Sequence, residues 1–213
     1  MLHHHNIPIT KSARFSSLGN RSGDIKELWF VLHGYGQLAA DFIKEFEPIQ
    51  EDSRFIVAPE ALSRFYVKRD PLRVGASWMT KECREQEIND YLAYLNQVAL
   101  FVYDMLDRRI PATVLGFSQG ATTASRWVTL GRFPAKKLIL WGGDIAQDLN
   151  MAEHGPIISQ MNPTIVVGDK DHYINQERLQ KEEERLQAHQ VSYELITFKG
   201  GHTLDPHVLR TIA

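Results

Sequence analysis

The sequence predicts an α/β protein whose mostly parallel central sheet carries helices on both faces. Short runs rich in Val, Ile, Leu and aromatic residues alternate along the chain with segments of helical periodicity. The cores of these runs are almost continuously apolar, as expected for parallel strands that are covered on both faces. Strands that alternate with helices in this way form a layered sheet.

Each element can be assigned from its own pattern. The expected core strands are residues 27–34, 54–60, 112–118, 137–143, 163–169 and 192–200, with a weaker edge strand in 7–17. The expected helices are residues 82–108, 119–130 and 175–190, followed by a last short helix that contains His207. The apolar stripe of the first helix has spacings of three and four and consists of Ile88, Tyr91, Leu95, Val98, Val102 and Met105. We expect the charged run 181–185 to face solvent, and the stretch around His154 to be irregular.

Length and composition limit the function classes. We expect residues 1–213 to form one domain, because a chain of 213 residues buries about 70% of its unfolded surface. The net charge of -2 does not favour nucleic acid or an anionic membrane surface, and no apolar run reaches the roughly 18 residues of a membrane span. The start of the chain lacks the pattern of a signal peptide, and the single Cys83, interpreted as a buried or bystander thiol, cannot form an intrachain disulfide. These features predict a cytoplasmic monomer or homodimer without stable membrane insertion.

The segment "GFSQG" (116–120) has the pattern G-x-S-x-G between a predicted strand and a predicted helix. A sharp strand-to-helix turn exposes its serine, and the following helix directs its N–H groups and positive dipole end at the same place. The alternative is a plain glycine turn with a serine helix cap. The context favours Ser118 as a nucleophile at the carboxyl edge of the sheet, where ligands bind in such folds.

A nucleophilic serine needs a base and an acid, which follow it in the order acid, then histidine, in this architecture. Of the histidines after Ser118, His202 lies in "FKGGHTL" (198–204), a glycine-containing loop directly after a strong strand. The acid is expected in the loop after the preceding strand, where Asp169 and Asp171 compete, with a modest preference for Asp171. The unchosen aspartate is expected to be structural.

The oxyanion of the tetrahedral intermediate needs two backbone N–H donors. One is expected from Gln119, the residue after the nucleophile, and the other from Tyr35 in the glycine-rich turn "VLHGYGQ" (31–37). His33 precedes the serine and is expected to brace this turn by hydrogen bonding.

Four motifs together resemble the phospholipase/carboxylesterase family of α/β-hydrolases, which includes acyl-protein thioesterases. They are "LHGYG" (32–36), "GFSQGA" (116–121), "GDKDHYI" (168–174) and "GGH" (200–202), and they cover nearly the whole chain in order. The resemblance implies an α/β-hydrolase fold without a large lid domain, with Ser118 as nucleophile and His202 as base. Its acid motif G-x-x-D-x-x-[VI] matches at Gly168, Asp171 and Ile174, which favours Asp171 over Asp169. "SWM" (77–79) stands where the family has Trp-Phe-Asp: Trp78 matches, whereas Met79 and Thr80 depart from the pattern.

These observations predict a serine hydrolase that cleaves small-molecule carboxylic esters through an acyl-enzyme, without metal or organic cofactor. The alternatives are a lysophospholipase or acyl thioesterase with the same triad, or a non-catalytic binding protein with this fold. A relative of dienelactone hydrolases is disfavoured, since these have cysteine at the position of Ser118. Residues 61–80 either form a packed surface loop or contribute to the substrate site, through Trp78, Tyr66 and Phe65 as groove-lining aromatics and Lys68, Arg69 or Arg73 as anion contacts.

Overall fold

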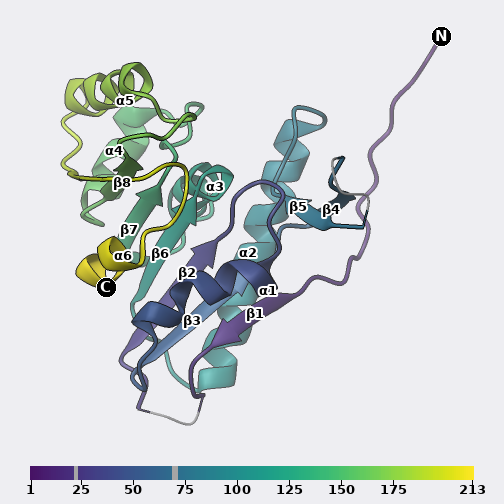
Figure 1. The fold of residues 1–213 in the computed structure, drawn as a ribbon. Helices are drawn as coiled ribbons and strands as arrows, with labels where there is room; N and C mark the ends of the chain where they lie inside the picture. Colours follow the sequence, from purple (N-terminus) through teal and green to yellow (C-terminus); the bar gives the residue numbers. More distant parts are fainter. Residues whose placement is uncertain (22–23, 69–71) are drawn as a thin grey trace.

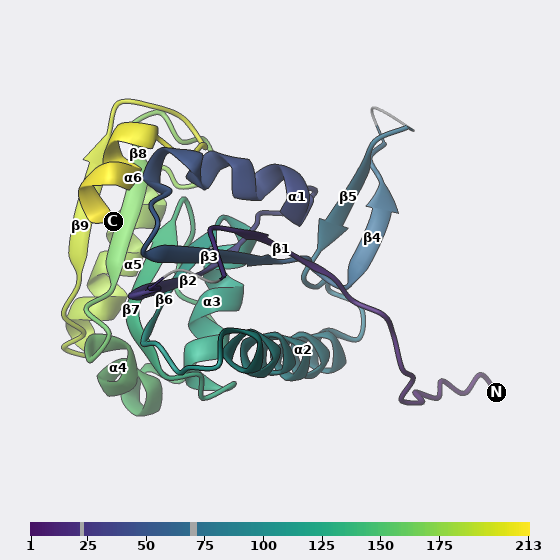
Figure 2. The ribbon, with the colours of Figure 1, turned by 90° about the horizontal axis from the view of Figure 1, so that it is seen from below.

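The computed structural model describes residues 1–21, 24–68 and 72–213. Its centre is a seven-stranded sheet in the order β1-β3-β2-β6-β7-β8-β9, with helices on both faces (Figure 1, Figure 2). Neighbouring strands run parallel except β1, which pairs antiparallel with β3. The predicted mostly parallel α/β sheet is confirmed.

The strands of this sheet are β1 (Phe15–Leu18), β2 (Glu27–Leu32), β3 (Arg54–Pro59), β6 (Ala112–Phe117), β7 (Ala135–Trp141), β8 (Thr164–Gly168) and β9 (Glu194–Phe198). A separate antiparallel pair consists of β4 (Ser63–Tyr66) and β5 (Val74–Ser77). The helices are α1 (Ala39–Phe42), the 3-10 helix η1 (Ile43–Ile49), α2 (Arg84–Leu106), α3 (Gln119–Thr129), α4 (Met151–Ser159), α5 (Gln176–Ala188) and α6 (Pro206–Ile212).

Two apolar cores lie on the two faces of the sheet, because successive side chains of a strand point to opposite faces. In β2, Leu28 and Phe30 belong to the core under α2, α3, α4 and α5, whereas Trp29 and Val31 belong to the core under α1, η1 and α6. All four are buried. Figure 2 shows the sheet between these two layers of helices.

Strands β2 and β6 form the switch point of the sheet. From β2 the chain crosses one face through α1 and η1 to reach β3, and from β6 it crosses the other face through α3 to reach β7. The two strands are paired up to Leu32 and Gly116. Beyond this pair the chain leaves the two strands for opposite faces of the sheet, and open α/β sheets bind ligands in the crevice at such a switch point.

Three local predictions need correction. The expected edge strand 7–17 is a strand only from Phe15, because β3 offers its antiparallel partner only there. The stretch around His154, expected to be irregular, is helix α4, which Asn150 caps by accepting the N–H of Ala152. Its Gly-Pro pair hides the helical pattern in the sequence, although Pro156 lies inside the helix.

The charged run 181–185 also differs from the prediction that it faces solvent. Glu182 is buried, and its carboxylate accepts hydrogen bonds from Ile145 N–H and from the side chains of Gln147 and Arg185. One side of α5 therefore holds the loop after β7, which no helical periodicity of apolar residues could indicate.

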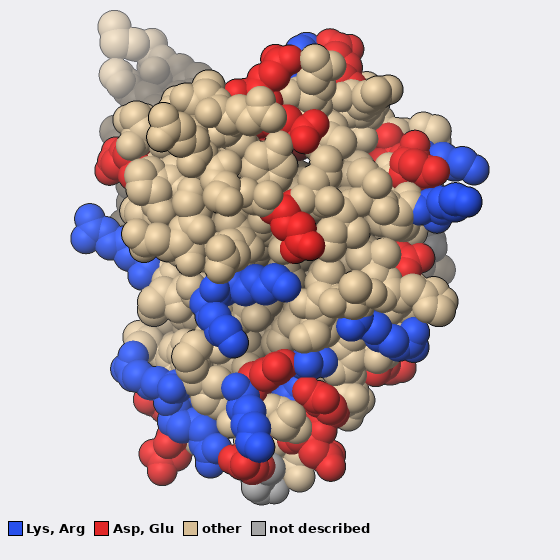
Figure 3. Space-filling view, turned by 90° about the vertical axis from the view of Figure 1, so that its left-hand side faces the viewer, with Lys and Arg blue, Asp and Glu red and all other residues tan. Residues whose placement is uncertain are grey.

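Between β3 and α2 the chain forms the small β4–β5 sheet, and no large lid domain is present in the part of the chain that the structure describes. No helix among these residues is long and apolar enough to cross a membrane. On the face drawn in Figure 3, acidic and basic side chains lie close together around broad uncharged areas.

Candidate active site

Ser118 lies in a sharp turn between β6 and α3. Its backbone has φ 54° and ψ -117°, a conformation that costs a non-glycine residue about 1–3 kcal/mol. A Cβ atom on Gly120 would collide with the carbonyl oxygen of Leu32, and one on Gly116 would collide with the carbonyl oxygen of Gly120. Both glycines of the G-x-S-x-G pattern are thus required by close backbone approach, and the turn holds the serine at the carboxyl end of β6.

Asp171 and His202 form a hydrogen-bonded pair at the carboxyl ends of β8 and β9. His202 Nδ1 lies 2.7 Å from Asp171 Oδ2, while Asp171 Oδ1 accepts the N–H groups of Tyr173 at 2.8 Å and Ile174 at 3.0 Å. Burial raises the pKa of this carboxyl group, but the hydrogen bonds from His202 and the two N–H groups outweigh it and lower the pKa below its usual value. A charged carboxylate here accepts Nδ1–H, so that Nε2 of the neutral ring is free to accept a proton.

The loop after β7 links this pair to the serine turn. A Cβ atom added to Gly142 would lie 3.1 Å from His202 Nδ1 and 3.4 Å from Asp171 Oδ2. A Cβ atom added to the next residue, Gly143, would lie 2.6 Å from the Ser118 carbonyl oxygen. Two consecutive glycines therefore lie beside the Asp–His pair and the serine turn, with no room there for larger side chains.

Two aromatic rings hold the His202 imidazole. The ring centroid of Phe117, the residue before the serine, lies 4.9 Å from that of His202, and the centroid of Tyr173 lies 4.6 Å from it. Tyr173 is 67% exposed, so this ring lies at the surface beside the imidazole. The sequence analysis did not single out either ring, although Tyr173 stands two residues after Asp171 in the acid motif.

The other candidate acid and the other histidines after Ser118 do not take part in the Asp171–His202 pair. Asp169 Oδ1 accepts the N–H of Gly200 at 2.9 Å and so connects the loops that carry Asp171 and His202. His172 is exposed on the same loop as Asp171. His154 Nε2 lies 3.9 Å from Glu153, whereas His189 and His207 are exposed residues at the end of α5 and in α6.

The turn after β2 lies directly against the serine. The Cβ position of Gly34 is 3.2 Å from Ser118 Cβ. Gly34 N–H donates to the side chain of Gln37 at 2.8 Å and Gly36 N–H donates to Ala76 O at 2.8 Å, while the N–H of Tyr35 between them has no recorded partner in the described chain. The N–H of Gln119, in the first turn of α3, has no carbonyl partner within its helix. Both candidate oxyanion donors are thus available at this crevice.

His33 braces the same turn from below. Its ring is fully buried, with Nδ1 2.8 Å from Gly34 O and Nε2 3.1 Å from the N–H of Ala61. Burial lowers the pKa of His33, which favours the neutral ring that donates through Nδ1 and accepts through Nε2.

The aromatic residues proposed for the substrate groove take different places. Trp78 is only 2% exposed, and its indole N–H donates to His33 O at 2.8 Å, so it supports the turn from the core and does not line an open groove. Phe65 stacks on Tyr35 with ring centroids 5.0 Å apart. Tyr66, next to Phe65 on β4, is exposed and points to the other face of the hairpin.

Among the described residues, the basic residues of the same segment form no hydrogen bond or ion pair with the serine turn. Lys68 and Arg73 are exposed, and Arg69 lies outside the described residues. Cys83 is exposed at the start of α2, not buried.

Comparison with known proteins adds the family. A model of the family described as Serine hydrolase (FSH1) matches residues 29–207, most of the chain. The chain belongs to this serine hydrolase family. This match and the solved structures that follow confirm the predicted resemblance to the phospholipase/carboxylesterase family of α/β-hydrolases. No curated protein sequence matches this serine hydrolase significantly.

Solved structures show the same fold for this serine hydrolase. A carboxylesterase from Mesorhizobium loti has a TM-score of 0.72 at 19% identity, covering 94% of this chain and 93% of that chain. Zea mays acyl-protein thioesterase 2 has a TM-score of 0.70 at 16% identity, with 94% and 96% covered. A phospholipase/carboxylesterase from Dyadobacter fermentans has a TM-score of 0.65 at 20% identity, with 97% of both chains covered. At these identities the likeness concerns the fold.

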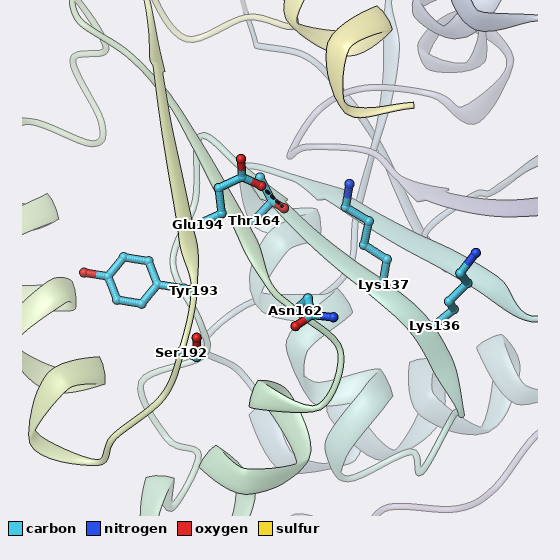
Figure 4. Close-up of a pocket in the computed structure, with 7 residues that line it drawn as sticks. All are labelled: Lys136, Lys137, Asn162, Thr164, Ser192, Tyr193 and Glu194. Atoms are coloured by element: carbon cyan, nitrogen blue, oxygen red, sulfur yellow. Dashed lines mark hydrogen bonds between the residues drawn. The ribbon is translucent and has the colours of Figure 1, made fainter.

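A surface hollow of about 440 Å³ lies at the opposite edge of the sheet in this serine hydrolase (Figure 4). Its walls come from the amino ends of β7, β8 and β9, where Thr164 Oγ1 donates to Glu194 and Lys137 Nζ donates to Ile212 O. The triad candidates follow the carboxyl ends of the strands, so this hollow is not part of their site. Among the residues described, no group of three or more His, Cys, Asp or Glu side chains is arranged to hold a metal ion.

Proposed function

We propose that this serine hydrolase is a carboxylesterase that uses Ser118, His202 and Asp171 as its catalytic triad. The observation that carries the proposal is the hydrogen-bonded Asp171–His202 pair beside Gly142, while the next residue, Gly143, lies beside the strained serine turn. The free N–H groups of Tyr35 and Gln119 at the same crevice supply the oxyanion hole.

In acylation, Ser118 Oγ attacks the carbonyl carbon of the ester while His202 Nε2 takes the hydroxyl proton. Asp171 keeps the other ring nitrogen, Nδ1, protonated and stabilises the imidazolium that forms. The N–H groups of Tyr35 and Gln119 bind the negative oxygen of the tetrahedral intermediate. When the C–O bond to the alcohol breaks, His202 returns the proton to the leaving alkoxide, and the acyl group remains on Ser118.

In deacylation, water repeats the same steps. His202 Nε2 takes a proton from the water molecule, whose oxygen attacks the acyl carbon. When the second tetrahedral intermediate collapses, the bond between the acyl carbon and Ser118 Oγ breaks, His202 returns the proton to Oγ and the carboxylic acid leaves. The starting protonation states of all three side chains are therefore restored in each cycle. The proposed substrates are small esters with uncharged or weakly charged acyl groups.

The surroundings of the crevice support apolar acyl groups. The stacked rings of Tyr35 and Phe65 lie on the side of the first oxyanion donor, and Tyr35 is 61% exposed. Tyr173 covers His202 on the other side. Exposed aromatic rings on both sides of a nucleophile offer apolar contact area to an acyl chain.

The test is a panel of p-nitrophenyl esters, acyl thioesters and lysophospholipids of increasing chain length. Wild type is compared with Ser118→Ala and with Ser192→Ala, an exposed serine remote from the crevice, as the matched control. We expect ester hydrolysis and labelling by a fluorophosphonate probe in wild type and Ser192→Ala, and loss of both in Ser118→Ala. If wild type is labelled by the probe but hydrolyses thioesters or lysophospholipids faster than esters, the enzyme is a thioesterase or a lysophospholipase and not a carboxylesterase. A wild type that takes no label and hydrolyses nothing would indicate a binding protein.

A further inference from the structure

The two proposed oxyanion donors belong to different elements, yet both are tied to one segment. Tyr35 follows β2 and Gln119 begins α3, and neither side of the crevice continues the pairing of β2 with β6 beyond Leu32 and Gly116. Residues 76–79, the end of β5 and the two residues after it, contact both sides. We call this stretch the bridging segment.

On the Tyr35 side, the bridging segment holds the turn by its backbone and by one indole. Gly36 N–H donates to Ala76 O at 2.8 Å and Ala76 N–H donates to Gln37 O at 3.2 Å, an antiparallel bridge around the turn. The indole N–H of Trp78 donates to His33 O at 2.8 Å. The turn is therefore fixed after Tyr35 by Ala76 and before it by Trp78.

On the Gln119 side, the side-chain amide of Gln119 makes the connection. Its Oε1 accepts the N–H of Trp78 at 3.0 Å, and its Nε2 donates to Met79 O at 2.8 Å. Ser77 Oγ lies 3.3 Å from Nε2 and itself donates to Met79 O. A backbone donor and a backbone acceptor thus define the orientation of the amide, which has one group to accept and one to donate.

The bridging segment is packed into the core of the protein. Ala76, Ser77 and Trp78 are buried, and the Trp78 ring packs against His33 and Tyr91. Trp78 bonds to the turn through its side chain and to Gln119 through its backbone. Trp78 therefore connects the turn after β2 to the start of α3.

We propose that the bridging segment sets the separation of the two oxyanion donors, with the Gln119 side chain and the Trp78 indole as its positioning groups. The inference rests on the proposed function and deepens it. Removing one oxyanion donor lowers the rate about 10²–10³-fold, and a misplacement of 1 Å can cost about 10²-fold. Loss of the amide or the indole contact leaves both donors present but misplaced, so we expect a smaller loss, about 10-fold to 10²-fold in kcat.

Three variants test the two positioning groups. Gln119→Leu removes both amide contacts, Gln119→Glu keeps the acceptor for Trp78 N–H but loses the donor to Met79 O, and Trp78→Phe loses the bond to His33 O. Each is expected to lower kcat for p-nitrophenyl ester hydrolysis about 10-fold to 10²-fold, with KM changed less than threefold. The affinity for an alkyl trifluoromethyl ketone, which forms a tetrahedral oxyanion on the serine, should fall in parallel. For Gln119→Leu and Trp78→Phe the midpoint of the pH–rate profile should not move, because neither change adds a charge near the Asp171–His202 pair.

Matched controls separate positioning from general destabilisation. Gln147 also bridges a loop by its amide, donating to Glu182 at 2.9 Å, and Trp127 is a buried tryptophan whose indole donates to Asn96 at 2.8 Å, both outside the crevice. Trp127→Phe should lower the thermal midpoint by an amount comparable to Trp78→Phe, and both Trp127→Phe and Gln147→Leu, at an exposed residue, should keep kcat within threefold.

Two results would overturn the inference. One is a kcat within threefold of wild type in folded Gln119→Glu and Trp78→Phe. The other is an equal fall of kcat in the two controls. A wild type without esterase activity or fluorophosphonate labelling would instead overturn the proposed function, so the two failures are distinguishable.

Discussion

Replacing Asp171 by Asn is expected to lower kcat for ester hydrolysis about 10⁴-fold, which corresponds to about 5 kcal/mol of activation free energy. The two N–H groups of Tyr173 and Ile174 require an acceptor at the position of Oδ1, so the amide oxygen is held there. The amide nitrogen then takes the position of Oδ2, 2.7 Å from His202 Nδ1. Since an NH₂ group cannot accept Nδ1–H, His202 is driven to the tautomer protonated at Nε2, which cannot take the proton of Ser118.

The assay is kcat for p-nitrophenyl acetate hydrolysis over the neutral to alkaline range, with thermal unfolding as a check on the fold. Asp169→Asn is the matched control on the same loop, because the retained amide oxygen can still accept the Gly200 N–H. We expect this control to lose less than tenfold. A kcat of Asp171→Asn within tenfold of wild type, or an equal loss in Asp169→Asn, would refute the assignment of Asp171 as the acid.

Three further predictions concern the turn, its support and the acid stability of the fold. Gly120→Ala should abolish activity and lower the yield of folded protein, because its Cβ would collide with Leu32 O; a soluble variant with wild-type kcat would contradict the described turn. His33→Phe leaves a buried N–H and a buried carbonyl without partners at about 1–3 kcal/mol each, so calorimetry should show a lower thermal midpoint together with a lower kcat. Burial raises the pKa of the Asp148 carboxyl, but the hydrogen bonds and charge of Arg126 outweigh it and bring the pKa to about 2. The folded pKa is thus below the usual 3.8, so this stabilisation is present above pH 4 and is lost as the pH falls toward 2. Asp148→Asn should therefore lower the thermal midpoint by several degrees at pH 7, with a difference from wild type that shrinks toward pH 2; a constant difference would contradict the ion pair.

Local sequence patterns predicted most of the central sheet and the long helices. All six expected core strands are present within a few residues of their predicted bounds, since continuous β-branched and aromatic runs mark buried parallel strands. Helix α4 was missed because Gly155 and Pro156 interrupt its pattern, and β4 and β5 were missed because their short, partly exposed strands carry a weak signal. These elements depend on capping or on each other, not on a long apolar period.

In the candidate site, too, some features could be predicted from the sequence and others depend on tertiary packing. The G-x-S-x-G turn and the order nucleophile, acid, histidine were predicted from turn chemistry and chain order, whereas the choice of Asp171 over Asp169 came mainly from the family resemblance. The burial of Trp78 and the place of Tyr173 over His202 could not be predicted, since both depend on packing between distant segments. The roles of the triad and of the two backbone donors remain predictions that the variants above test.

What the sequence alone determined is the alternation of strands and helices, the strained position of Ser118 and the family resemblance. Each follows from the spacing of residues that are neighbours in the chain. Only the tertiary structure decided the partner of Asp169, the other aspartate on the loop of Asp171: Asp169 accepts the N–H of Gly200. It likewise joined the Gln119 side chain to Trp78, 41 residues away. The physical reason is that a buried donor or acceptor must find a partner wherever packing brings one, and a linear sequence does not specify those distances.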